Sequence, residues 1–250
     1  MHKTSSLLAS IATTLALPAV HAALLVPGST SQQVSASGEI EESGLSDSQS
    51  DSAQSLLAQS FVDQAFISFS LDGGSGQVTA SSSLNSSFLT DAINAIGGAS
   101  ASAQSAPGFG VTDTAQSTAA SAFSYKFEVS EPVTYNLSGS VSGVAPEGGP
   151  ASSTSYVSLR IDGGVFLFST APDEIFADSG PLTPGVTYVL TGYAHAGAFD
   201  FQALGTGASA NYDFAFSVTP VPEPQHYALA AGLALIGFGA VRRISRRRQD

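Results

Sequence analysis

Apolar and polar residues alternate along much of the chain between residues 61 and 218, the pattern of strands with one buried face. The alternation is most regular at 122–129 and recurs in the last such segment, 208–218. In these two segments every second residue is large and apolar: Phe123, Tyr125, Phe127 and Val129 in the first, and Tyr212, Phe214, Phe216 and Val218 in the second. We therefore predict two strands that direct these side chains into a common core.

Two Asp-Gly-Gly triplets predict hairpin turns, because glycine adopts a positive φ at little cost. Asp72-Gly73-Gly74 separates the alternating segments 61–71 and 76–82. Asp162-Gly163-Gly164 separates 156–161 from 165–169 in the same way. The two carboxylates are interpreted as turn residues rather than ligands.

Three further segments predict strands. Residues 133–141 alternate and are expected to pair with 122–129 across Ser130-Glu131-Pro132. Residues 186–194 follow the turn signal Pro184-Gly185, with Val186, Tyr188 and Leu190 directed inward. Residues 34–40 alternate more weakly and predict an edge strand.

Other segments lack this alternation. Residues 89–96 predict one short helix, with Thr90 or Asp91 as its cap and Gly97 at its end. Residues 99–118 are small and polar and predict a long surface loop, and residues 44–52 predict a shorter one.

Nine or ten short strands with turn residues between them predict an all-β protein. We expect an antiparallel β-sandwich, jelly-roll-like, with one short helix and a separate C-terminal transmembrane helix. Fifteen phenylalanines without any tryptophan suit a core built from alternating strand faces.

The first 22 residues predict a secretory signal peptide. His2 and Lys3 give a weakly charged start, and residues 7–17 are apolar and small. Val20-His21-Ala22 fits the small-x-small pattern, so cleavage is expected after Ala22. The body of the mature protein then spans 23–219 and has the length of a single domain.

The last thirty residues have three parts in a fixed order. Pro222, Glu223 and Pro224 interrupt regular structure, because proline fixes φ and lacks the backbone donor. An apolar run from Tyr227 to Val241 follows, and a basic cluster then ends the chain: Arg242, Arg243, Arg246, Arg247 and Arg248. A helix of fifteen residues is only about 22 Å long, so it spans a thin bilayer with its arginines reaching back to the headgroups. The positive-inside rule places these arginines in the cytoplasm and the body outside.

This tail is similar to the PEP-CTERM sorting signal of Gram-negative bacteria, over residues 221–248. The shared features are the Pro-Glu-Pro motif, small and apolar residues with spaced glycines (Gly232, Gly237, Gly239), and terminal arginines. The resemblance implies that an exosortase recognises the tail in the inner membrane and cuts near Pro222–Pro224. The released body would then go to the cell surface or the extracellular polysaccharide matrix. The alternative is a plain C-terminal membrane anchor.

Charge and composition argue against some classes of binding partner for the body. The formal net charge is −12, although five arginines belong to the tail and Lys3 to the signal peptide. Only Lys126 and Arg160 remain in the body, which makes it strongly acidic and argues against nucleic acid or anionic lipid as partners. The chain has no cysteine and therefore no disulfide or thiol chemistry.

Candidate chemistry is sparse. Five carboxylates near the start of the body could hold Ca²⁺ (Glu39, Glu41, Glu42, Asp47 and Asp51), but they lack the spacing of a dedicated calcium loop, so a solvated surface is favoured and no metal or cofactor is expected. His195 is the body's one histidine, and no Gly-x-Ser-x-Gly elbow accompanies it. Zinc would need more imidazole or thiolate ligands than the body has.

We therefore expect a non-catalytic exported protein with a structural role in the surface matrix. The alternative is a glycan-binding module or a carbohydrate-active enzyme built on the same fold. Paired carboxylates for glycoside cleavage stay open, because the sequence gives no distance between them. A row of tyrosines on one sheet face would favour carbohydrate binding.

Overall fold

The structure is a computed structural model of the chain. It describes residues 25–42, 45–70, 76–105, 113–146, 150–201, 204–221, 231–232, 234–236 and 238. Twelve β-strands lie among these residues and are built into two antiparallel sheets. Their bounds are β1 Leu25–Glu42, β2 Leu45–Ser55, β3 Phe61–Ser70, β4 Gln77–Phe88, β5 Ala92–Gln104, β6 Thr114–Val129, β7 Val133–Val144, β8 Ser152–Ile161, β9 Phe166–Ser169, β10 Ile175–Leu182, β11 Tyr188–Asp200 and β12 Thr206–Pro220.

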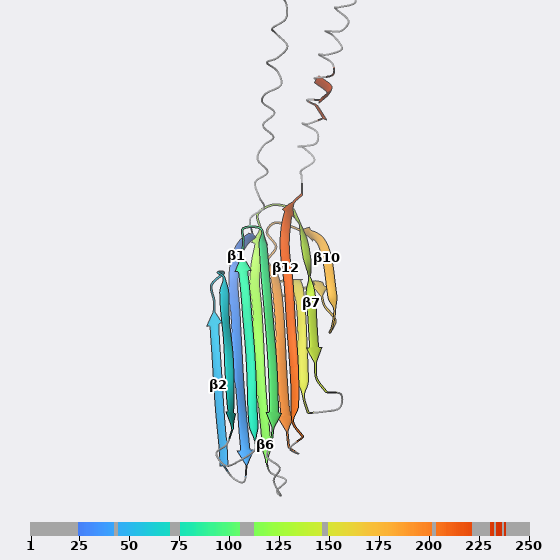
Figure 1. The fold of residues 1–250 in the computed structure, drawn as a ribbon. Helices are drawn as coiled ribbons and strands as arrows, with labels where there is room; N and C mark the ends of the chain where they lie inside the picture. The colour runs from blue at the N-terminus through green and yellow to red at the C-terminus, as the bar shows by residue number, and fades with distance from the viewer. Residues whose placement is uncertain are drawn as a thin grey trace, which may run out of the picture.

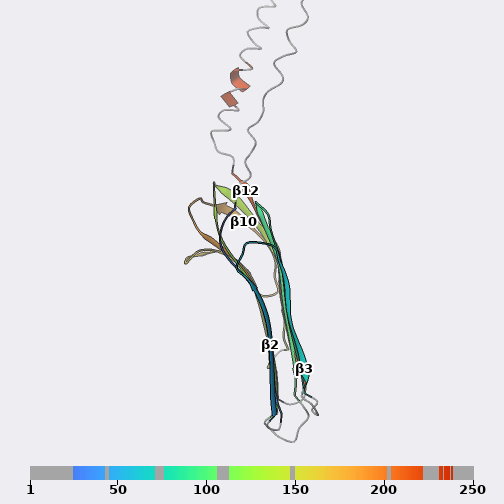
Figure 2. The ribbon, with the colours of Figure 1, turned by 90° about the vertical axis from the view of Figure 1, so that its left-hand side faces the viewer.

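The two sheets have six strands each and pack as two layers (Figures 1 and 2). The first sheet has the order β2-β1-β6-β11-β8-β9, and the second has the order β10-β7-β12-β5-β4-β3. Edge strands β2 and β3 lie along the same side of the molecule, one in each sheet (Figure 2). Between them, the backbone N–H of Phe66 donates to the Asp51 carboxylate at 3.0 Å, which joins the two layers along this side. The prediction of an all-β, antiparallel, sandwich-like body is confirmed at this level.

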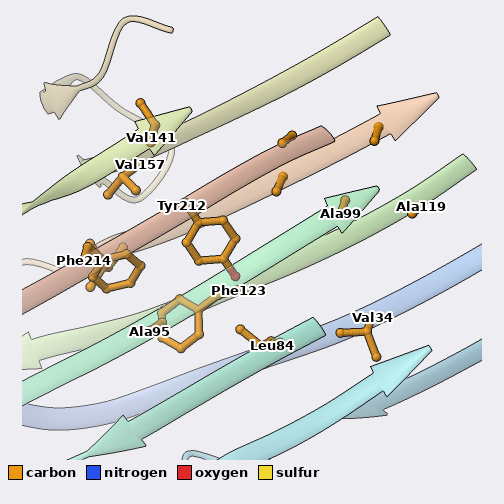
Figure 3. Close-up of a cluster of buried hydrophobic side chains, with 14 of the residues drawn as sticks. Val34, Leu84, Ala95, Ala99, Ala119, Phe123, Val141, Val157, Tyr212 and Phe214 are labelled. Atoms are coloured by element: carbon orange, nitrogen blue, oxygen red, sulfur yellow. The ribbon is translucent and has the colours of Figure 1, made fainter. Parts of the chain in front are cut away.

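The buried layer changes character along the strands. At the end where β1 begins and β12 ends, it is aromatic: Phe123, Phe127, Phe214 and Phe216 are at most 1% exposed. Their rings lie next to one another, with Phe123 and Phe214 centroids 5.5 Å apart (Figure 3). Toward the opposite end many buried side chains are small, as at Ala99, Ala101, Ala115, Ala119 and Ala196, although Ile40, Phe69 and Val78 are also buried there. We call the first end proximal and the second end distal.

The strand predictions with large apolar side chains are confirmed. All four inward side chains predicted at 122–129 and all four at 208–218 are buried. Strands β3 and β4 pair as expected, although the turn Asp72-Gly73-Gly74 lies outside the described residues. The second hairpin, β8–β9, is also present, and Gly163 has the positive φ of 67° that the turn requires. The strand predicted after Pro184-Gly185 forms as β11, with Tyr188 and Leu190 buried.

The short helix predicted at 89–96 is wrong. Residues 92–96 belong to β5, which lies between β4 and β12 and is hydrogen-bonded to both. Ile93 and Ala95 face the core, whereas Ile96 is 55% exposed on the outer face. A strand between two neighbours forms backbone hydrogen bonds on both sides. This tertiary pairing overrides the weak local preference for a helix.

The loops predicted at 99–118 and 44–52 are wrong as well. Within the first range, residues 99–104 belong to β5 and 114–118 to β6, where small buried residues (Ala99, Ala101, Ala103, Ala115 and Ser117) alternate with more exposed polar ones; residues 106–112 lie outside the described residues. The second range contains β2, an edge strand paired with β1 along 11 residue pairs. Consequently β1 lies between β2 and β6, so residues 34–40 are not the edge strand that we predicted.

The predicted pairing of 122–129 with 133–141 is wrong. Strand β6 pairs with β1 and β11 in one sheet, and β7 pairs with β10 and β12 in the other. Ser130-Glu131-Pro132 therefore carries the chain from one layer to the other. Both arrangements keep the same side chains inward, so the alternation alone cannot distinguish them.

The ends of the sandwich-like body lie together at the proximal end (Figure 1). The backbone N–H of Leu25 donates to the Thr90 carbonyl at 3.2 Å, and that of Val221 donates to the Pro132 carbonyl at 3.0 Å. Beyond Val221, the structure describes only a few helical residues, at 231–232, 234–236 and 238. Within the part of the chain that the structure describes, no helix has the length and apolar character needed to cross a membrane. The signal peptide with Ala22, Pro222–Pro224 and Arg242–Arg248 lie outside the described residues.

Candidate binding face on the β8–β11 side of the molecule

The strongest candidate site lies on the outer face of the first sheet, along β11. Alternate β11 residues, from Leu190 to Ala198, are buried against the second sheet, and the residues between them point outward. Those outward positions include Thr191, Tyr193 and His195. On the neighbouring strand β8, Val157 and Leu159 are fully buried, which directs Tyr156 to the same outer face.

Three rings on this face form a continuous aromatic row: Tyr156, Tyr193 and His195. Tyr156 and Tyr193 are direct cross-strand partners, and their ring centroids are 5.4 Å apart with an interplanar angle of 33°. Tyr193 and the His195 imidazole follow along β11, 6.4 Å apart and nearly parallel at 5°. All three side chains are half-buried. The row therefore presents ring surface to solvent on a rigid, paired part of the sheet.

Gly197 continues the outward positions of β11 beyond His195. A Cβ at Gly197 would lie 3.6 Å from the His195 Cε1 atom and 3.0 Å from the Ser152 hydroxyl. The imidazole therefore extends over the glycine.

The aromatic row lies among four cross-strand rows, each made of residues that pair with one another across β8, β11 and β6. None of these four cross-strand rows carries a charged side chain. From β8 across β11 and β6, these rows are Ser152-Gly197-Thr118, Thr154-His195-Ala120, Tyr156-Tyr193-Ala122 and Ser158-Thr191-Ser124. On β1 they continue to Ser37, Ser35, Gln33 and Ser31. The nearest charged side chains on this face lie one row beyond, at Arg160 and Lys126 on one side and at Glu39 on the other. Hydroxyl and amide groups therefore border the rings without a formal charge among them.

The Tyr193 phenol stays neutral under ordinary conditions. Partial burial raises its pKa above the usual value for tyrosine, and the neighbouring Tyr156 raises it further. A neutral phenol can both donate and accept a hydrogen bond at the rim of the ring. The row thus combines an apolar face with a polar edge, which is the property that makes tyrosine common in recognition surfaces.

His195 was weighed from the sequence as the one possible catalytic base of the body. Its ring packs along Tyr193, and no hydrogen bond within the described residues connects it to a serine or to a carboxylate. The imidazole is therefore part of the aromatic row.

The carboxylates that could have held Ca²⁺ are divided between different surfaces. Glu39 lies on the outer face and accepts a 2.8 Å hydrogen bond from the Gln116 amide. Asp51 points toward the other sheet and accepts from the Phe66 backbone. Among the described residues, no group of three or more His, Cys, Asp and Glu side chains is arranged to hold a metal ion.

Asp162 of the second hairpin has a structural role. Its carboxylate accepts a hydrogen bond from the Lys126 ammonium at 2.9 Å, and this contact is the main cause of its lowered pKa. The pair lies at the surface, with 40% and 38% of the two side chains exposed, and connects the β8–β9 turn to β6.

The aromatic row was not identified from the sequence, although the signal was present. Tyr156 precedes the inward Val157, and Tyr193 lies between the inward Gly192 and Ala194. Assigning the phase of these two strands would have placed both tyrosines outward. Their lateral pairing could not be foreseen, because it depends on the order of strands in the sheet.

Comparisons with known proteins leave the family open. No protein-family model matches the chain, and no curated protein matches it. Among solved structures, the GH31 alpha-xylosidase Xac1773 from Xanthomonas citri is 9% identical, with a TM-score of 0.18. The match covers 72% of this chain and 32% of the enzyme, so this chain corresponds to about a third of that protein. A TM-score of this size shows neither a shared fold nor a shared activity.

Proposed function

We propose that this chain is an exported, non-catalytic protein whose tail is a PEP-CTERM sorting signal. In this proposal the signal peptide directs export and is removed after Ala22. The tail holds the precursor in the inner membrane through Tyr227–Val241, with Arg242, Arg243, Arg246, Arg247 and Arg248 in the cytoplasm. An exosortase then cuts near Pro222, Glu223 and Pro224, and the body becomes part of the cell surface or extracellular polysaccharide matrix.

The observation that carries the proposal is the position at which the last strand of the body ends. Strand β12 ends at Pro220, and the backbone N–H of Val221, the last residue described before Pro222, donates a hydrogen bond to the Pro132 carbonyl. Pro222 is the next residue. All twelve strands therefore precede the motif, and cleavage within Pro222–Pro224 would release them without breaking a strand pair.

The positions of the two ends of the body also support the proposal. Leu25 and Val221 both lie at the proximal end, so segments that extend from either terminus leave the body on the same side. A precursor held at this end would direct its distal end away from the bilayer.

A structural role without catalysis is supported by the arrangement of the candidate groups. His195 stacks on Tyr193, and the described carboxylates of the early acidic stretch lie on separate surfaces. We also propose a jelly-roll-like classification for the body, supported by its two six-stranded antiparallel layers. A second candidate function, glycan binding, is favoured by one observation: the aromatic row on the outer face of β8 and β11.

Replacing Pro222, Glu223 and Pro224 together by alanine tests the sorting proposal. In a host that carries an exosortase, we expect the variant to remain uncut in the inner-membrane fraction, while the parent protein leaves it. The matched control replaces Pro146, Glu147 and Pro150, the same three residue types between β7 and β8, and should be processed like the parent. Release of the motif variant with the parent's C-terminus would contradict the proposal.

A further inference from the structure

We propose that the aromatic row binds an uncharged glycan, with pyranose rings packed on the surface that Tyr156, Tyr193 and the His195 imidazole form together. A neutral glycan would thus be a partner of the body. That the body meets this glycan in the surface matrix rests on the proposed function, whereas the binding itself does not.

The spacing of the rings carries the first step. Tyr156 and Tyr193 are neighbours across the strands, 5.4 Å apart, and Tyr193 and His195 are neighbours along β11, 6.4 Å apart, so the three rings form a corner with sides close to the length of one sugar unit. The C–H groups on one face of a pyranose are apolar and suit the face of an aromatic ring, while its hydroxyls point sideways. The Tyr193 and His195 rings are within 5° of parallel.

The border of the row supplies the polar half of the site. Thr154 pairs with His195 across the strands, and Gln33 lies in the same cross-strand row as Tyr193. Thr154 and Gln33 are exposed, so their hydroxyl and amide groups are free to contact the equatorial hydroxyls of a sugar. Few, well-placed polar groups around an apolar centre are the usual composition of a small-molecule site.

Charge selects the class of glycan. The four rows around the aromatics contain no Asp, Glu, Lys or Arg. Of the 20 acidic residues of the chain, only Glu223 and Asp250 lie beyond the body, which retains just Lys126 and Arg160 as basic residues. An anionic polysaccharide would be repelled by this surplus and would find no cation in the four rows, so a neutral glycan is the matching ligand.

A second pair of exposed rings, Phe199 and Phe201, lies at the end of β11 with centroids 6.0 Å apart, and single exposed rings occur elsewhere. Phe66 is 57% exposed on the outer face of the second sheet, but it lies on the edge strand β3 opposite Ser81. No described ring stacks on it. It therefore serves as a matched control for an exposed aromatic side chain outside the site.

The test is calorimetric titration of the full-length chain, kept in a non-glycosidic detergent so that no detergent sugar competes. The probes are cellohexaose, maltohexaose and mannohexaose as neutral glycans, and an alginate oligosaccharide of similar length as the anionic one. We expect binding of at least one neutral glycan. Tyr193→Ser and Tyr156→Ser should each weaken it roughly tenfold, about 1.4 kcal/mol at 25 °C, through loss of a stacking surface. Phe66→Ala should leave it unchanged.

Circular dichroism melts of each variant separate loss of stacking from loss of fold. Tyr193→Phe retains the ring and should retain most of the affinity. No binding of the three neutral glycans, preference for alginate, or full binding by a folded Tyr156→Ser/Tyr193→Ser variant would overturn the proposal. Because the titration uses the uncut chain, its failure is independent of any failure in sorting.

Discussion

Tyr212 shows how single residues determine the distance between the two layers. Its ring is 1% exposed and lies between Gly97 of its neighbouring strand and Gly192 of the opposite sheet. A Cβ at Gly97 would come within 2.3 Å of the Tyr212 ring, and one at Gly192 within 2.6 Å. The hydroxyl lies 3.4 Å from the Ser121 hydroxyl, and burial raises the pKa of the phenol well above its usual value. Both glycines thus provide the space that this ring occupies.

Gly192→Ala is accordingly expected to destabilise the protein by about 1–3 kcal/mol, because the added methyl group meets the rings of Tyr212 and Phe214. Denaturant melts measure the difference. Gly207→Ala on β12 is the control: its Cβ would meet nothing nearer than 3.4 Å, so it should change stability by less than about 0.5 kcal/mol. Equal effects of the two substitutions would contradict this account of the core.

Within each strand, side chains alternate between the core and the outer face, and only those that face the core contribute strongly to stability. Phe127 on β6 is 0% exposed and packs against Phe216 at 5.3 Å and Tyr188 at 5.7 Å. Phe66 on β3 lies at an outward position of its strand and is 57% exposed. A shift of one residue in either strand would exchange these environments.

Phe127→Ala should therefore cost about 3–5 kcal/mol of unfolding free energy, as for a fully buried ring. Phe66→Ala should cost less than about 1 kcal/mol, since its side chain is largely solvated. Chemical denaturation of the two variants provides the comparison. Losses of similar size would show that the strand phases are misassigned.

The sequence predicted strands where inward residues were large, and failed where they were small. Residues 122–129 and 208–218 have phenylalanine and tyrosine at inward positions, which contrast strongly with serine and lysine. In β5 and the start of β6 the inward residues are alanine and serine, and this weak contrast predicted a loop. Residues 89–96 have apolar spacing that suits a helix, and only the two neighbouring strands explain why β5 forms instead.

Partners across the sheet could not be predicted in the same way. Alternation determines the face of a side chain, whereas the neighbour of a strand depends on the whole topology. The hairpins β3–β4 and β8–β9 were predictable because their partners are adjacent in sequence. The β8–β11 pairing, which creates the aromatic row, joins residues 27 to 45 positions apart in the sequence and has no local signal. The individual residues of the candidate site could therefore be placed outward, but their association could not be predicted.

For the whole molecule, the arrangement of ends and surfaces connects the fold to the proposed function. Both ends of the body lie at the aromatic, proximal end, and the last strand finishes one residue before Val221. The body that precedes Pro222 is acidic and has an uncharged aromatic face on one side. These features suit a module that is tethered at one end, released, and then held by contacts with neutral glycan.

Mass spectrometry of the protein recovered from the medium and matrix fractions tests the central claim most directly. Mapping the C-terminal peptide of the released chain locates the cut. We predict that this peptide ends within Pro222–Pro224, so that β12 is intact and both Tyr227–Val241 and the terminal arginines are absent. A released chain that still ends at Asp250, or one that ends within β12, would contradict the account.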